Sequence, residues 1–243
     1  MKSFNALLVS ILITLTVPGS VTCQDVRSLL DRSTKFTAGG KVFEDDLYGF
    51  PTYHEDGVLN GVAYRIYYLD GSGTFEGVKG NGVGAKTIAE RSIDDEKKNW
   101  NILCREDAVD IFGCFVGNYS LAVFRDTKGN QFVAVRGHDD PRGATVSVTL
   151  DDSLNFTDAR DTQFLGATAA KIVERLKTAK QVTTTFRAAK DRPATTTKFE
   201  VYGFVEALTY LDWLISTCRK TYDARKGSRP DILGGGYQTC NKK

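Results

Sequence analysis

The sequence predicts a mainly β protein: an antiparallel β-sandwich or barrel against which two amphipathic helices pack. Three observations support this fold class. Short segments alternate apolar and polar residues, which is typical of half-buried strands. Loops that contain Gly or Asp separate these segments, as they do in β-hairpins. Two later segments carry an apolar residue at every third or fourth position, which indicates helices with one buried face. An antiparallel sheet covered by helices satisfies all three patterns.

The strand pattern begins near Lys41 and is clear from residue 63 onward. Residues 63–69 are rich in aromatic and β-branched side chains, and Asp70-Gly-Ser-Gly73 predicts a hairpin loop into the strand that follows. The clearest hairpin joins residues 120–125 to 131–136 through a Gly-containing loop at 126–130. Further alternating runs predict strands at residues 73–78, 100–104, 111–116, 144–150, 181–187 and 196–202.

Two segments change to helical spacing. The first has its apolar stripe on Ala169, Ile172, Val173 and Leu176, and charged residues occupy the opposite side. The second has its stripe on Phe204, Leu208, Leu211 and Ile215. Each stripe predicts a helix that packs one face on the core.

Residues 1–23 have the layout of a cleavable signal peptide. Lys2 supplies a positive charge, residues 6–17 form an apolar core of about a dozen residues, and Pro18-Gly19 breaks the helix. A membrane anchor needs roughly 20 apolar residues, so an uncleaved membrane helix or a buried helix is the less favoured alternative. We expect cleavage after Cys23 and a secreted or periplasmic protein. Residues 20–23 also resemble a lipoprotein signal, although the residue before Cys23 suits lipidation poorly.

The cysteines agree with export. Of the five, Cys23 would leave with the signal peptide, and an even number remains, which in an oxidising compartment suggests two disulfides. Three pairings are open, and we favour Cys104–Cys114 and Cys218–Cys240 because each closes a local loop. The second bridge would staple a Gly-rich C-terminal tail. A zinc site is disfavoured because the sequence has no Cys-x-x-Cys and no histidine near a cysteine.

Composition excludes some classes of function. The formal net charge is only +2, with Lys and Arg spread along the chain, whereas nucleic-acid binders show a clustered basic excess. No segment after residue 23 approaches the length of a transmembrane helix. We therefore expect a partner that is a protein or a small ligand, with no nucleic acid, no cofactor and no metal.

Several motifs favour ordinary structural roles. Residues 80–87 look like a phosphate-binding loop, but Ala85 replaces the second glycine and no long amphipathic helix follows. His138-Asp139-Asp140, with His54 as the other histidine, fits a surface turn better than a metal or acid–base site. Tyr64 and Tyr68 are predicted to share one strand face and Tyr67 the other, as in common sheet packing.

Two further groups of residues do not identify a function from the sequence. The carboxylates of Asp151, Asp152, Asp158 and Asp161 are candidates for glycosidase-type chemistry only if two of them face each other across a cleft. Asn118-Tyr-Ser and Asn155-Phe-Thr fit the glycosylation acceptor pattern, which matters only for a eukaryotic source.

An ordered set of features lies between residues 98 and 217. An aromatic-led strand ends at Cys104, Cys114 follows, and then come the 121–136 hairpin, the 166–180 helix and Tyr202–Leu211 with its Gly-Phe-x-x-Ala-Leu pattern. In this order they resemble the invasion-associated locus B family of exported bacterial proteins. The resemblance implies a periplasmic or surface-exposed β-sandwich without known catalytic residues, and some members are linked to host-cell invasion.

The chain departs from that family in two ways. Members usually have a further cysteine pair around the first helix, and residues 164–167 here have none. The chain also has extra length before residue 98 and a tail that ends in Cys240. We therefore divide it into a signal peptide (1–23), a β-rich extension (24–97) and a locus B-like domain with a disulfide-stapled tail (98–243).

These observations favour an exported, non-enzymatic protein that binds a partner, with a host molecule among the candidates. Two alternatives stay open: a secreted hydrolase whose catalytic carboxylates we do not identify, and an envelope structural or chaperone-like protein. A pair of acidic residues in a deep cleft would favour the hydrolase, and an exposed apolar or aromatic patch would favour the binding protein.

Overall fold

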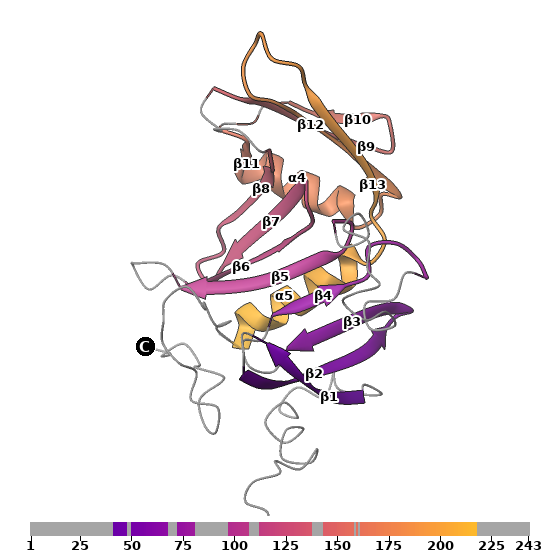
Figure 1. Ribbon diagram of the computed structural model, residues 1–243. Helices are drawn as coiled ribbons and strands as arrows, with labels where there is room; N and C mark the ends of the chain where they lie inside the picture. Colours follow the sequence, from indigo (N-terminus) through magenta and orange to yellow (C-terminus); the bar gives the residue numbers. More distant parts are fainter. Residues whose placement is uncertain are drawn as a thin grey trace, which may run out of the picture.

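The computed structural model describes residues 41–47, 50–67, 72–80, 97–106, 112–137, 143–157, 159 and 161–217. These residues form two antiparallel sheets and two helices (Figure 1). The predicted fold class, mainly antiparallel β with two packed helices, is confirmed. Residues 1–23, with the predicted signal peptide, and the predicted Cys218–Cys240 bridge lie outside the described residues.

The larger sheet has nine strands in the order β1-β2-β3-β4-β5-β6-β7-β8-β11, so each strand up to β8 pairs with its predecessor in the chain. Its strands are β1 (Lys41–Leu47), β2 (Phe50–Leu59), β3 (Val62–Tyr67), β4 (Gly73–Phe75), β5 (Trp100–Glu106), β6 (Phe112–Gly117), β7 (Leu121–Asp126), β8 (Gln131–Val135) and β11 (Gln163–Leu165).

The smaller sheet has four strands in the order β10-β9-β12-β13. Its strands are β9 (Thr145–Leu150), β10 (Leu154–Phe156), β12 (Gln181–Arg187) and β13 (Thr195–Glu200). The three-residue strands β10 and β11 were not predicted, because so short a segment shows no alternation. The predicted hairpin between β7 and β8 is confirmed.

The turn of this hairpin shows why the sequence signal was clear. The Asp126 carboxylate accepts hydrogen bonds from the backbone N–H groups of Lys128 and Asn130, each at 2.8 Å. Gly129 has φ +82°, a left-handed conformation that glycine adopts without steric cost. An Asp at the start and a Gly inside the loop are thus the residues that this turn requires.

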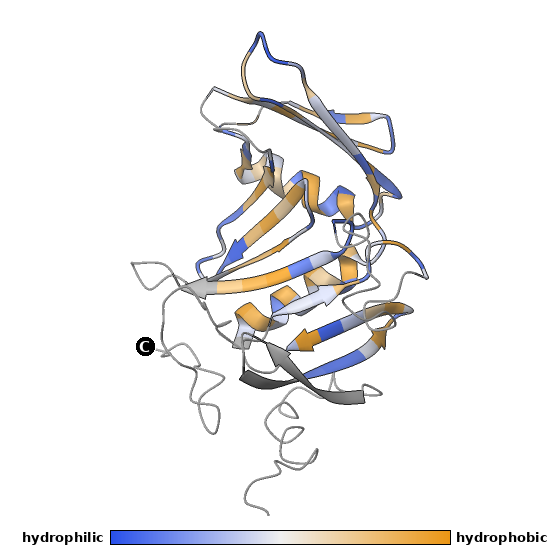
Figure 2. Ribbon diagram, viewed as in Figure 1, coloured by the Kyte–Doolittle hydropathy of each residue, from blue (hydrophilic) through white to orange (hydrophobic). Residues whose placement is uncertain are grey.

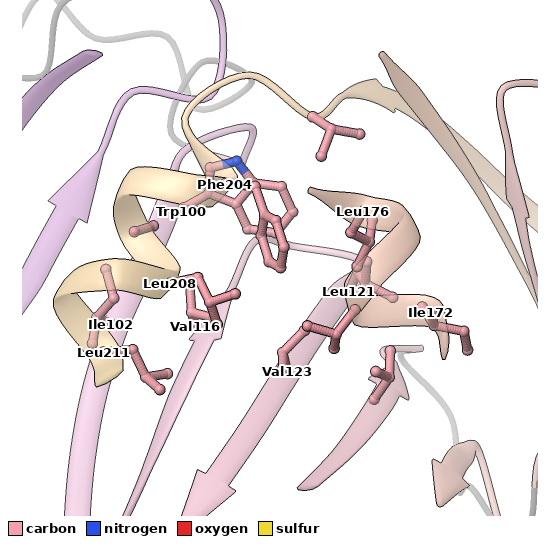
Figure 3. Close-up of a cluster of buried hydrophobic side chains, with 14 of the residues drawn as sticks. Trp100, Ile102, Val116, Leu121, Val123, Ile172, Leu176, Phe204, Leu208 and Leu211 are labelled. Carbon is pink, nitrogen blue, oxygen red and sulfur yellow. The ribbon is translucent and has the colours of Figure 1, made fainter. Parts of the chain in front are cut away.

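Both helices lie on one face of the larger sheet, which we call the inner face. Helix α5 (Phe204–Thr217) packs on β4, β5 and β6, and α4 (Gly166–Leu176) packs on β8 and β11. Figure 3 shows sheet residues such as Trp100 and Val116 against Phe204 of α5, with Leu176 of α4 in the same cluster. Among the described residues, no helix combines the length and hydropathy that a membrane crossing requires.

Trp100 lies at the centre of this core. Its side chain is fully buried, and its ring centroid is 5.0 Å from that of Phe204. The indole Nε1–H donates a hydrogen bond to the Tyr202 carbonyl oxygen at 2.8 Å, which ties β5 to the segment that leads into α5. A buried indole needs such a partner for its N–H group.

Strands β3 and β4 belong to the segment predicted as an extension, yet they continue the same sheet. Phe75 of β4 lies opposite Trp100 of β5, and its ring is 5.8 Å from the ring of Tyr210 on α5. Residues on both sides of position 98 therefore share one core and one covering helix.

Cys104 and Cys114 lie directly opposite each other on β5 and β6 and form a disulfide, with both residues buried. The two cysteines are 10 positions apart in the chain. Replacing both cysteines by Ala is expected to lower the free energy of unfolding by about 3 kcal/mol, because the unfolded chain regains the entropy of the loop that the bridge closes. Urea denaturation of the two proteins measures the difference, and equal transition midpoints would contradict this prediction.

Candidate functional site

The outer faces of the two sheets differ in chemistry. On the smaller sheet, alternating residues of β9, β12 and β13 point outward, and they are polar throughout. This outer face carries Thr145, Ser147, Thr149, Gln181, Thr183, Thr185, Arg187, Thr196, Lys198 and Glu200. Such a composition is the ordinary result for a sheet face in contact with water.

On the larger sheet, five large apolar residues cross the outer face in a line, which we call the aromatic row. They oppose one another on successive strands, from β5 through β6, β7 and β8 to β11, in the order Leu103, Phe115, Phe124, Phe132 and Leu165. With strands about 4.8 Å apart, the row is about 19 Å long.

The rings in the row contact one another. The Phe124 and Phe132 rings are stacked with centroids 4.7 Å apart, and the Phe115 and Phe124 centroids are 4.8 Å apart. The three phenylalanines are half-buried, whereas the ends of the row are open: Leu103 is 41% and Leu165 50% exposed. An apolar line of this kind, exposed at both ends, is unusual on a sheet face in contact with water, and it makes the row the candidate functional site.

The row arises because β6, β7 and β8 are apolar on both faces. Val116, Val123 and Val133 point into the core, while the phenylalanines next to them in sequence point outward. Figure 2 shows hydrophobic colours along much of β7 for this reason. Continuous apolar strands are typical of sheets covered on both sides, and the two helices that the structure describes, α4 and α5, both pack on the inner face.

Glycine and alanine neighbours shape the row. A Cβ at Gly113 would lie 2.5 Å from the Phe124 ring, so that ring lies flat on the strand only because position 113 has no side chain. On the other side of the row, Gly117 and Ala122 are opposed and buried. The Phe124 ring therefore packs against the backbone at Gly113, and the small residues Gly117 and Ala122 lie buried beside the row.

The outer face becomes polar toward β2 and β3. Arg65 holds Asp56 by two hydrogen bonds of 2.7 and 2.8 Å, and His54 Nε2 lies 3.7 Å from the same carboxylate. Burial alone would raise the pKa of Asp56, but the hydrogen bonds and charges of Arg65 and His54 lower it to about 2. These groups stabilise one another and form a structural ion-pair cluster on this part of the face.

The tyrosines of β3 are separated as their alternation predicted. Tyr64 is buried on the inner face, where its hydroxyl donates a 2.8 Å hydrogen bond to the buried Glu55 carboxylate. Burial, followed by the hydrogen bond to Glu55 and then the charge of that carboxylate, raises the pKa of Tyr64. Tyr67 lies on the opposite face with Arg65, and Tyr68 lies outside the described residues. Tyr64 therefore has a packing role and does not present its ring to a ligand.

The candidate carboxylates anchor turns. Asp151 accepts hydrogen bonds from the backbone N–H groups of Lys180 and Gln181 at 2.9 and 3.1 Å. Asp152 forms an ion pair with Lys198 at 3.0 Å. Asp161 has φ +47° in the turn before β11. Asp158, His138-Asp139-Asp140 and residues 81–87 of the glycine-rich string lie outside the described residues.

No group of three or more His, Cys, Asp or Glu residues that would hold a metal ion occurs in the part of the chain that the structure describes. The two glycosylation acceptors differ in accessibility. Asn118 is 3% exposed, and its side-chain oxygen accepts hydrogen bonds from the N–H groups of Ser120 and Leu121. Asn155 is exposed on the smaller sheet, bonded to the Thr149 hydroxyl.

Sequence reasoning missed the aromatic row. Its signal is present in β6, β7 and β8, where apolar residues occupy both parities of the strand, but a line across strands requires their register. No family model, no curated protein and no solved structure matches this chain. The resemblance to the invasion-associated locus B family therefore stays a prediction, and the proposals below depend on the geometry.

Proposed function

We propose that this chain is an exported, non-enzymatic protein that binds a partner protein through the aromatic row. The observation that carries the proposal is the apolar line from Leu103 to Leu165 on the outer face of the larger sheet, half-buried in the middle and exposed at both ends. Burying such side chains in an interface contributes about 25 cal/mol for each Å² removed from water. The outer face of the smaller sheet offers no comparable apolar surface.

The shape of the row favours a protein partner. Small molecules bind in concave sites that enclose most of their surface. The row is a line about 19 Å long that crosses five strands of one sheet face. An apolar line of this length matches the extended surface of another protein. Aromatic side chains are also enriched at the centres of protein interfaces.

Export is supported by two observations. Residues 1–23 have the signal-peptide pattern, and the Cys104–Cys114 disulfide is of a kind that persists in oxidising compartments. We therefore place the partner in the periplasm, on a surface or in the medium.

The hydrolase alternative has no support from Asp151 or Asp152, because both carboxylates bind turn or strand residues.

Site-specific photo-crosslinking tests this proposal. A photoreactive phenylalanine at position 165, where Leu165 is 50% exposed, is expected to trap one protein in the native source. The same group at position 58, where Val58 is 65% exposed but lies far from the row, is expected to trap none.

A substitution in the row shows whether the trapped protein depends on it. Leu103→Ser is expected to reduce the yield of the crosslink from position 165 severalfold, because truncating a residue that anchors an interface costs more than about 1 kcal/mol. Val205→Ser is the matched control, because Val205 is 40% exposed, as Leu103 is 41%, but lies on α5. The proposal fails if both positions give the same products, if the crosslink is insensitive to Leu103→Ser, or if the product contains only this chain.

A further inference from the structure

Strand β13 is an edge strand with open hydrogen-bonding groups. It pairs with β12, and no other strand in the described residues pairs with it. Four of its six residues are exposed. An unpaired edge presents a row of backbone donors and acceptors that is a template for another strand.

The register between β12 and β13 shows which backbone groups face the free edge. The Val201 N–H donates to the Lys180 carbonyl at 3.0 Å, whereas the Asp151 N–H donates to the Gln181 carbonyl at 3.1 Å. On β12, therefore, residue 181 bonds toward β9 and residues 180 and 182 bond toward β13. Since backbone groups alternate sides along a strand, Thr196, Lys198 and Glu200 direct their N–H and C=O groups to the free edge.

Strand β13 lacks most of the devices that protect edge strands, and the lysine that it carries, Lys198, is held in an ion pair with Asp152. Natural edges are blunted by proline, by bulges or by charges that point inward. Residues Thr195–Glu200 contain no proline or glycine, and three consecutive threonines favour the extended conformation. The two charged residues, Lys198 and Glu200, lie on the polar outer face, where Lys198 forms an ion pair with Asp152. They are spaced two apart and so share that face.

We infer that β13 pairs with β13 of a second copy of this chain, antiparallel and centred on Phe199. In this register Lys198 lies directly opposite the second copy's Glu200, and Glu200 opposite its Lys198. Directly opposed unlike charges stabilise a strand pair, whereas a register centred on Lys198 would oppose two lysines. The residues that face the edge, Lys198 and Glu200, are the same ones that this register brings into hydrogen bonding.

The dimer joins the two smaller sheets into one continuous sheet across a two-fold axis. It leaves the aromatic row, which lies on the other sheet, open for the partner proposed above. The inference therefore stands on a separate surface and does not depend on that proposal.

Sedimentation velocity of the mature chain over a range of concentrations tests the inference. We expect a monomer–dimer equilibrium in which the dimer fraction rises with concentration. Lys198→Glu opposes two like-charged pairs across the axis, so the dissociation constant is expected to rise roughly tenfold or more. Lys198→Glu combined with Glu200→Lys restores opposite charges and is expected to return the constant to within about threefold of the original value.

Two controls distinguish a loss of strand pairing between copies from a change in the structure of the single chain. The charge-swapped double variant still lacks the Lys198–Asp152 contact, so its recovery cannot come from that contact. Lys177→Glu makes the same charge change at an exposed residue that directly follows α4 and is expected to leave the equilibrium unchanged. The inference is overturned by a monomer at every concentration, by a dimer that is insensitive to Lys198→Glu, or by a double variant that does not recover.

Discussion

Gly203→Ala is expected to lower the free energy of unfolding by about 3 kcal/mol or more, the largest loss that we predict for a single methyl group. Gly203 precedes α5 with φ +75°, and a Cβ there would collide with the Glu76 carbonyl oxygen. The left-handed conformation costs a non-glycine residue about 1–2 kcal/mol. Forcing the backbone apart costs roughly 1–3 kcal/mol more. Denaturant unfolding of the purified variant measures the sum.

Gly129→Ala is the matched control for this substitution. Gly129 has nearly the same backbone angle, φ +82°, but an added Cβ would meet no atom within 4 Å. Only the conformational cost applies, so the expected loss is about 1 kcal/mol. Equal losses in the two variants would show that the approach of residues 203 and 76 does not limit stability.

Trp100→Ala is expected to lower the free energy of unfolding by about 4 kcal/mol. The indole is fully buried between β5 and α5, so its removal leaves a cavity and takes away the contact with Phe204. It also leaves the Tyr202 carbonyl without the 2.8 Å hydrogen bond from Nε1. Urea denaturation, followed by circular dichroism, measures the change without relying on tryptophan fluorescence.

One variant separates the causes of this loss, and a second serves as a comparison. Trp100→Phe keeps an aromatic ring but removes the hydrogen bond, and it is expected to cost about 2 kcal/mol. Trp213→Ala removes a half-buried ring that stacks on Tyr210 with centroids 5.6 Å apart, and it is expected to cost less than Trp100→Ala. A Trp100→Ala loss no greater than the Trp213→Ala loss would contradict the central role of Trp100.

Much of the fold is predictable from local patterns because one face of most strands is buried. The alternation of Trp100, Ile102 and Cys104 matches the inner face of β5, and the stripe of Ala169, Ile172, Val173 and Leu176 is the buried face of α4. The strands that were missed, β10 and β11, have three residues each, which is too few for a period to show. Their pairing is set by tertiary contacts.

The candidate site could not be predicted in the same way. Phe115, Phe124 and Phe132 are separated by 9 and 8 positions in the chain, and only the register of β6, β7 and β8 places them in one line. Apolar residues on both faces of a strand normally indicate complete burial. This rule, applied to β6, β7 and β8, indicates a sheet covered on both faces, whereas the described helices cover only the inner face.

The position of α5 has a consequence for the order in which the chain folds. From β1 to β8, each strand finds its partner immediately before it in the chain, so these pairs form by short-range search. The helix that covers β4, β5 and β6 is the last described element, ending at Thr217. Until it arrives, the apolar side of the sheet around Trp100 is open to water and to other chains. A chain that is synthesised or exported with its amino end first therefore completes this core only after almost all of its residues have emerged.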